Sequence, residues 1–173
     1  MTFGRWVTAV ALLAVVASAA PGLARAQEGS GCAGFKWPLD SERAALIRPD
    51  KPSLGNGGAL ALNVATTLEL QPLASAALPK EPERGPRSPQ AFAGHFALPA
   101  PAKAGVYKVT ISSPGWIDVL DGGNYLHPKA FSGATACEGA RKSIKFDLPS
   151  RPLAIQFSDV EGDKISVIVS PDQ

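Results

Sequence analysis

The fold class of this chain is decided by the stretch Val106-Tyr107-Lys108-Val109-Thr110-Ile111-Ser112, in which apolar and polar side chains alternate. Successive side chains of a β-strand point to opposite faces, so a two-residue period predicts a strand with one buried and one wet face. The apolar members of the stretch are expected in a core. Lys108 and Thr110 are expected on the solvent face.

Similar alternation returns along much of the chain. The other expected strands are 59–64, 67–71, 94–98, 116–120, 143–148, 153–157 and 165–169. Polar turns separate several of them, among them Asp121-Gly122-Gly123-Asn124, whose glycines and asparagine accept positive φ angles. Short strands with one wet face predict an all-β fold, an antiparallel β-sandwich of jelly-roll type with seven or eight strands.

The N-terminal part of the chain lacks this alternation. Residues 27–58 are expected to be irregular apart from one short helix at 40–47, which Pro49 ends. Residues 79–89 hold four prolines and five charged side chains, which predicts an exposed loop. The expected organisation is therefore a leader at 1–26, an irregular segment at 27–58 and a β-sandwich domain at 59–173.

The first 26 residues have the order of a secretory signal peptide. Arg5 precedes an apolar run from Trp6 to Ala20, and the small-x-small motif Ala24-Arg25-Ala26 follows. A membrane anchor is the alternative, but a spanning helix needs about 20 apolar residues and this run is shorter. We expect cleavage after Ala26, a periplasmic or secreted protein, and no integral membrane span.

The charge balance restricts the partners. The chain has 17 Lys and Arg against 15 Asp and Glu, and two of the arginines lie in the expected leader. The remainder is formally neutral and has no basic stripe. Nucleic acids and anionic membrane surfaces are therefore not expected as partners, because both are bound through net positive charge.

Two cysteines, Cys32 and Cys137, remain after the leader. In an oxidising compartment they are expected to form a disulfide. The closed loop would hold roughly 100 residues, for which the chain-entropy model gives roughly 4–5 kcal/mol of stabilisation. The alternative is a thiolate that binds metal or acts as a nucleophile, although no Cys-x-x-Cys spacing is present.

The region from 125 to 141 is the predicted ligand-binding loop, since long loops at the ends of a rigid sandwich commonly carry function. Its candidate ligand-binding residues are Tyr125, His127, Lys129, Phe131 and Arg141.

Other chemistries have weaker support in the sequence. His127 and His95 could take part in a metal site, and Asp118 with Asp121 could form a weak calcium site. No Gly-x-Ser-x-Gly, Ser-x-x-Lys, phosphate-loop or His-Glu-x-x-His motif is present. Of the remaining candidates, Ser143 is expected to face water, and Trp116 and Tyr107 are expected to fill the core.

Three segments carry a resemblance to the small secreted β-sandwiches that follow bacterial peptidase domains, the pre-peptidase C-terminal type. They are Ala104-Gly-Val-Tyr-Lys-Val-Thr-Ile111, Gly115-Trp-Ile-Asp-Val119 and Ile165-Ser-Val-Ile-Val169, all in the C-terminal half. The resemblance implies a secreted sandwich with an accessory role.

The whole chain after the leader, from Phe35-Lys-Trp-Pro-Leu39 to Ala140-Arg-Lys-Ser-Ile-Lys-Phe146, is similar to a family of uncharacterised exported proteins of alphaproteobacteria. Some members carry the label homogentisate dioxygenase. The residues here do not support that label, because such an enzyme needs a two-His, one-carboxylate iron site in a much larger chain. This chain has two histidines, far apart in sequence.

These observations predict a non-catalytic binding or accessory module without a cofactor. Its partner would be an envelope protein, a glycan or a small ligand. A metal-dependent enzyme or metal-binding protein with a site near His127 is one alternative, and a structural envelope protein is another.

Overall fold

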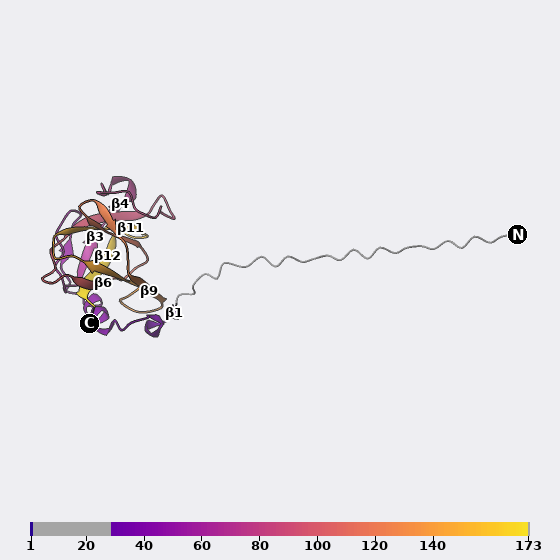
Figure 1. Cartoon of the computed structure of the whole chain (residues 1–173), viewed down its shortest axis with the longest axis horizontal. Helices are drawn as coiled ribbons and strands as arrows, with labels where there is room; N and C mark the ends of the chain where they lie inside the picture. Colours follow the sequence, from indigo (N-terminus) through magenta and orange to yellow (C-terminus); the bar gives the residue numbers. More distant parts are fainter. Residues whose placement is uncertain (2–28, 173) are drawn as a thin grey trace.

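Two β-sheets pack face to face in the computed structural model, which describes Met1 and residues 29–172 (Figure 1). The predicted signal peptide, apart from Met1, lies outside the described residues. The larger sheet has the order β1 (Gly29–Ser30), β9 (Ala130–Thr135), β10 (Lys142–Leu148), β6 (Gly105–Ile111), β12 (Lys164–Pro171), β3 (Thr66–Glu69) and β2 (Ser53–Leu54). The smaller sheet has the order β4 (Gln71–Pro72), β5 (Phe92–Leu98), β11 (Leu153–Val160), β7 (Trp116–Asp121) and β8 (Asn124–Leu126).

The predicted all-β sandwich is confirmed, with more strands than expected. Eight of the twelve strands in residues 29–172 hold four or more residues, and the other four are pieces of two or three residues at or near the sheet edges. Pairing is antiparallel except at two edges, where β1 runs parallel to β9 and β2 runs parallel to β3. The expected helix is present as α1 (Asp40–Leu46), and two short 3₁₀ turns are η1 (Cys32–Gly34) and η2 (Leu73–Ser75). None of the helices in the described part of the chain is long and apolar enough to cross a membrane.

The core lies between the two sheets and is built from the apolar side of each alternating strand. From β6, Tyr107, Val109 and Ile111 are buried in it as predicted. Phe96 of β5 and Phe157 of β11 meet edge to face, with their ring centroids 6.0 Å apart. This is the arrangement that the ring quadrupoles favour.

Residues 59–64 do not form the predicted strand. Leu60 donates its N–H to Ala97 in the smaller sheet, and Asn63 donates its N–H to Val169 in the larger one. The segment therefore crosses from one sheet to the other, turning at Asn63 with φ 62°. The alternating apolar residues of 59–64 place Leu60 in the core, but the backbone turns before a strand can form.

The predicted loop at 125–141 contains strand structure. β8 ends at Leu126, and β9 occupies 130–135 between β1 and β10. The side chains of β9 that are buried, Ser132 and Ala134, are small, so the hydrophobic pattern does not reveal this strand.

Three side chains expected in water are buried. Lys108, Thr110 and Ser143 lie on the outer face of the larger sheet, away from the core. The N-terminal segment 32–47 lies across this face, and α1 packs against β12, close to the C-terminus (Figure 1). Leu46 of α1 is buried there with Ala65 and Ile168.

The assignment of Trp116 to the core is also wrong. Trp116 is half-buried and lies opposite Ser158 on the outer face of the smaller sheet.

The expected disulfide is present. Cys32 and Cys137 are bonded, with their Cα atoms 4.6 Å apart across 105 positions of sequence. The bond attaches η1 to the turn between β9 and β10. The segment expected to be irregular is thus part of the sandwich, with β1 and β2 as its contributions to the larger sheet.

Candidate functional site

The five predicted ligand-binding residues do not converge on one site. Lys129 pairs with a carboxylate of β10 at 3.2 Å, and the ring of Phe131, which is 58% exposed, lies 5.1 Å from the ammonium of Lys36. Arg141 alone of the five lines a pocket beside Trp116.

Tyr125 and His127 instead contact the proline-rich loop. The Tyr125 hydroxyl donates to the carbonyl of Glu81, and the ammonium of Lys80 lies 4.3 Å from the Tyr125 ring centroid. His127 Nδ1 is 3.6 Å from a carboxylate oxygen of Glu83. Desolvation, with the negative charges of nearby carboxylates, raises the pKa of Tyr125, so the hydroxyl stays protonated as a donor.

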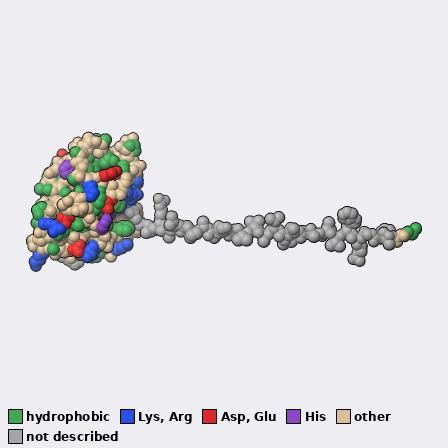
Figure 2. Space-filling model, turned by 45° about the horizontal axis from the view of Figure 1, so that its top comes forward, with side chains coloured by type: hydrophobic (Ala, Val, Ile, Leu, Met, Phe, Trp, Pro, Cys, Tyr) green, Lys and Arg blue, Asp and Glu red, His purple; other side chains and the backbone are tan. Residues whose placement is uncertain are grey.

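The structure offers no assembled metal site in the part of the chain that it describes. No group of three or more His, Cys, Asp or Glu side chains there is placed to hold an ion. The two histidine patches lie apart on the face in Figure 2, where acidic and basic side chains are interspersed. Asp121, one of the calcium candidates, is paired with Arg151.

A loop of residues 73–91, which we call the covering loop, crosses the outer face of the smaller sheet. Its base is closed by a hydrogen bond of 2.8 Å from the Leu73 N–H to the Ala91 carbonyl. Its exposed tip contains the predicted proline-rich stretch 79–89. Its cations reach the smaller sheet: Lys80 donates to the Gly123 carbonyl at 2.7 Å, the Arg84 guanidinium lies 5.6 Å from the Trp116 ring centroid, and Arg87 pairs with Asp159.

A β-bulge in β11 provides the strongest anchor of the covering loop. Pairing with β5 is interrupted between Phe157 and Val160, and Asp159 lies in the left-handed region with φ 56°. The extra residue returns Val160 to the core and leaves the buried Asp159 carboxylate facing the loop. That carboxylate accepts from the Arg87 backbone N–H at 2.9 Å and from Arg87 Nε at 2.6 Å.

A pocket of about 190 Å³ opens beside this anchor, and we call it the cationic pocket. Its lining residues are Arg84, Arg87, Pro114, Gly115, Trp116, Arg141, Lys142 and Asp159. Among these described residues, four cationic side chains from the covering loop and the start of β10 thus lie with the Asp159 carboxylate around the Trp116 ring. Lys142 donates to the Gly115 carbonyl and lies 5.9 Å from the Trp116 ring centroid.

The Trp116 ring is oriented from behind by a buried carboxylate. Its Nε1–H donates to Asp118 Oδ1 at 2.6 Å, and Gln156 Nε2 donates to Asp118 Oδ2 at 3.0 Å. Charge-assisted hydrogen bonds of this kind are stronger than neutral ones, so the indole is held rigidly at the pocket wall.

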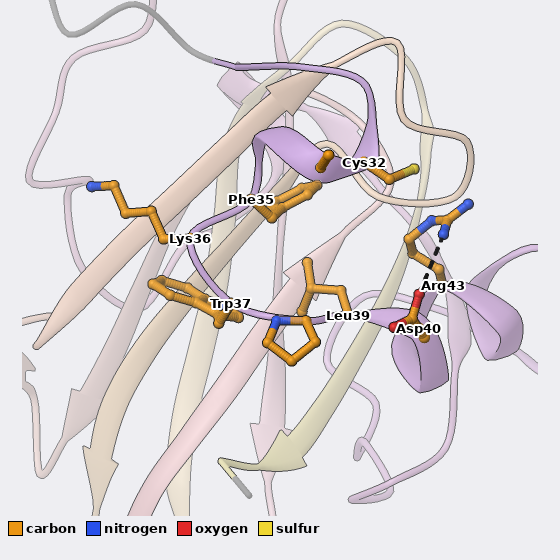
Figure 3. Close-up of a pocket in the computed structure, with 9 residues that line it drawn as sticks. Cys32, Phe35, Lys36, Trp37, Leu39, Asp40 and Arg43 are labelled. Atoms are coloured by element: carbon orange, nitrogen blue, oxygen red, sulfur yellow. Dashed lines mark ion pairs between the residues drawn. The ribbon is translucent and has the colours of Figure 1, made fainter.

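A larger hollow of about 380 Å³ lies at the N-terminal segment (Figure 3). Its lining residues within the described part of the chain all belong to 32–43, so there it follows the bend of one segment. Its charged pair, Arg43 and Asp40, is 3.8 Å apart and spans one helical turn. The cationic pocket, built from separate elements with converging charges, is the better candidate site.

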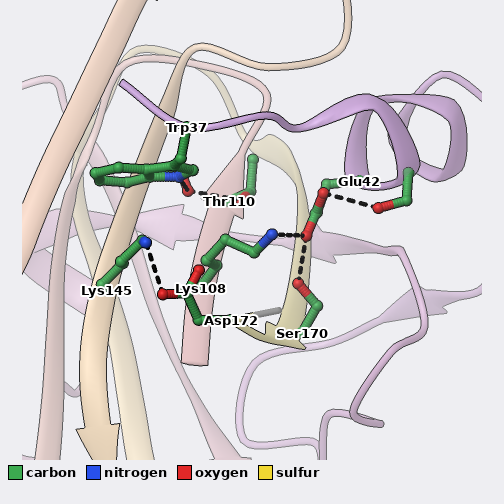
Figure 4. A network of polar contacts seen from close by, with 9 residues as sticks. Trp37, Glu42, Lys108, Thr110, Lys145, Ser170 and Asp172 are labelled. Atoms are coloured by element: carbon green, nitrogen blue, oxygen red, sulfur yellow. Dashed lines mark hydrogen bonds and ion pairs between the residues drawn. The ribbon is translucent and has the colours of Figure 1, made fainter. Parts of the chain in front are cut away.

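The N-terminal segment is fastened by a polar network beneath it (Figure 4). Trp37 Nε1–H donates to Ser143 Oγ at 3.1 Å, and the Thr110 hydroxyl is 3.0 Å from the same oxygen. The Lys145 ammonium lies 4.5 Å from the Trp37 ring centroid and pairs with Asp172 at 2.6 Å.

A buried ion pair completes this network. Lys108 Nζ of β6 lies 2.7 Å from Glu42 Oε1 of α1, and the side chains of Glu42 and Lys108 are only 3% and 8% exposed. Ser170 and Ser41 also donate to the Glu42 carboxylate, at 2.7 and 3.0 Å. Burial acts to raise the pKa of Glu42, but the hydrogen bonds from Lys108, Ser170, its own backbone and Ser41 outweigh this effect, and the pKa is lowered.

Comparison with known proteins gives no relative: no family model, curated protein or solved structure matches this chain.

We predict that Lys108→Met lowers the free energy of unfolding by about 3–5 kcal/mol, because it leaves the Glu42 carboxylate buried without its cation. Combined with Glu42→Leu, most of that loss should be recovered, since a well-packed apolar pair often replaces a buried ion pair without cost. Urea unfolding measures both. Lys129→Met is the matched control and should cost at most about 1 kcal/mol, because its pair with Asp147 is exposed. A double variant no more stable than Lys108→Met would contradict the explanation that the loss comes from the unpaired Glu42 carboxylate.

The lowered pKa of Glu42 predicts a pH dependence. A carboxyl whose folded pKa lies below its unfolded value stabilises the fold above the unfolded pKa and loses that contribution as the pH falls through the folded pKa. The difference in unfolding free energy between the wild type and Glu42→Gln should therefore be constant above about pH 5.5 and shrink below about pH 4.5. Urea titrations at pH 7 to 3 test this. A difference that stays unchanged down to pH 3 is the contrary result.

Proposed function

We propose that this chain is an exported, non-catalytic binding module and that the cationic pocket holds an anionic ligand. The observation that carries the proposal is the pocket itself: Arg84, Arg87, Arg141 and Lys142 surround Trp116, and Asp159 is the one carboxylate among the described lining residues. Cationic groups that converge on one hollow attract an anion to it.

The donors in the pocket suit an oxyanion. Guanidinium groups present paired N–H donors that match carboxylate, sulfate or phosphate oxygens. Arg84 and Arg87 belong to the covering loop, whereas Arg141 and Lys142 lie at the start of β10 in the larger sheet, so the cations come from two separate elements. Trp116 adds an apolar wall for the rest of the ligand.

The pocket lining also supports a binding role over a catalytic one. The described residues that line it include no histidine, cysteine or serine, so the common pair of a hydroxyl or thiol nucleophile with a histidine base is not among them. The partner is then a small anion or an anionic group of an envelope glycan or protein.

Export is supported by two features. The leader-like order of residues 1–26 is the first. The disulfide between Cys32 and Cys137 is the second, because such bonds persist in oxidising compartments.

The binding proposal predicts that sulfate and acetate bind with an affinity that falls as NaCl is added, because salt screens the attraction. Isothermal titration calorimetry at low ionic strength measures this. Arg84→Ala should weaken binding roughly 10- to 100-fold, the value of a hydrogen bond to a charged group. Arg48→Ala, which removes an exposed arginine paired with Asp50, is the matched control and should leave binding unchanged. Equal affinities in the two variants would refute the assignment of the pocket.

For export, the full-length chain should be recovered from the periplasm of a Gram-negative host with Gln27 as its first residue, because the small-x-small motif ends at Ala26. Intact mass measurement identifies the N-terminus, and Ala26→Arg should block processing. Recovery of the unprocessed chain from the cytoplasm would disprove this part of the proposal.

A further inference from the structure

The outer face of the smaller sheet carries a row of polar side chains. His95, Gln156 and Asp118 occupy directly opposed positions on β5, β11 and β7. Ser158 lies two residues further along β11, opposite Trp116. Asp118, Gln156 and Ser158 are each at most 3% exposed, although their side chains point away from the core.

Several polar atoms of this row have no hydrogen-bond partner within residues 29–172. They are His95 Nδ1, Gln156 Oε1 and Ser158 Oγ. Leaving one buried polar atom unpaired costs about 1–3 kcal/mol. If the covering loop never left this face, apolar side chains on it would lower the free energy of the folded state more than polar ones do. Three unpaired atoms on neighbouring positions therefore indicate a face that meets a hydrogen-bonding partner when it is uncovered.

The covering loop is attached around this row by contacts that can be released. Its anchors on the sheet are the Gly123 carbonyl, the Tyr125 hydroxyl, the Trp116 ring and the Asp159 carboxylate. Most of the loop between Pro79 and Pro89 is exposed. The contacts of Lys80 and Tyr125 are exposed and contribute little stability each, so the part of the loop before Arg84 can lift at a smaller free energy than unfolding of the whole domain, while Arg87 stays bound to the buried Asp159 carboxylate.

The chemistry of the row fits a hydroxyl-rich ligand. A carboxylate, an amide, an imidazole and a hydroxyl offer both acceptors and donors, and sugar hydroxyls can both donate and accept. Trp116 and Tyr125 flank the row with rings that suit the apolar faces of a sugar. Arg84 stays against the Trp116 ring, so the pocket keeps its cations when the preceding part of the loop lifts.

We propose that this row is a sugar-binding surface continuous with the cationic pocket and that the ligand is an acidic oligosaccharide. Its acidic group enters the pocket, where Arg87 stays bound to Asp159, and the adjoining sugar ring lies across the row beneath the lifted part of the covering loop before Arg84. The inference rests on the proposed anion site and extends it, because Trp116 belongs to both surfaces.

The experiment compares uronic-acid trisaccharides of galacturonate, glucuronate and mannuronate with acetate and with the methyl-esterified trisaccharides. At least one acidic trisaccharide should bind at least about tenfold more tightly than acetate, since it adds several hydrogen bonds, and its ester should bind more weakly than the acid. If acetate binds and every trisaccharide binds no better, the sugar surface is refuted while the anion site stands. If no anion binds at all, both proposals fail.

Two variants test the surface itself. Ser158→Ala should keep the melting temperature, because its hydroxyl has no partner in the covered state, and should weaken trisaccharide binding about 3- to 10-fold without changing acetate binding. Tyr125→Phe removes one anchor of the covering loop, so it should speed exchange of the Trp116 indole N–H and tighten trisaccharide binding by populating the open state. Unchanged trisaccharide affinity in both variants would overturn the proposal.

Discussion

Most of the longer strands in the described part of this protein have two unlike faces, and the architecture follows from the need to cover both. The apolar faces meet between the sheets and form the core around Phe96 and Phe157. The polar faces point outward, yet much of each is removed from water. The N-terminal segment 32–47 covers one and the covering loop 73–91 covers the other. The protein is in effect a two-sheet sandwich with a polar layer and a non-strand cover on each side.

The two covers of the sandwich are fastened differently. The N-terminal segment is held by a disulfide and by the buried pair of Glu42 and Lys108, and hydrogen bonds satisfy both partners and the neighbouring Ser143. The covering loop is held by contacts that surround a row of polar side chains. Three buried polar atoms of that row, in His95, Gln156 and Ser158, have no partner among the described residues. A satisfied polar interface is stable, whereas buried polar atoms without partners lower the stability of the cover above them.

The sequence predicts what depends on local pattern. Strong alternation locates β6, β10, β11 and β12, and Pro49 and the cysteines locate the helix end and the disulfide. The small buried side chains of β9 give it no hydrophobic pattern. At 59–64 the alternation predicts a strand, but the chain there crosses from one sheet to the other. A two-residue period shows that Lys108 points away from the core but not that a helix from elsewhere covers it. The cationic pocket has no local signal either, because a bulge at Asp159 and a distant loop bring its arginines to Trp116; Arg141 is the one predicted site residue that lines it.

The topology also sets an order of assembly. β1 needs β9, Cys32 needs Cys137, and β3 needs β12, the last of the described strands. Cys32 can therefore reach its partner only when Cys137, 105 positions later, has been synthesised. Pairings so distant in sequence make folding slow. Because α1 packs against β12, closure of the N-terminal segment over Lys108 also depends on a strand far along the chain.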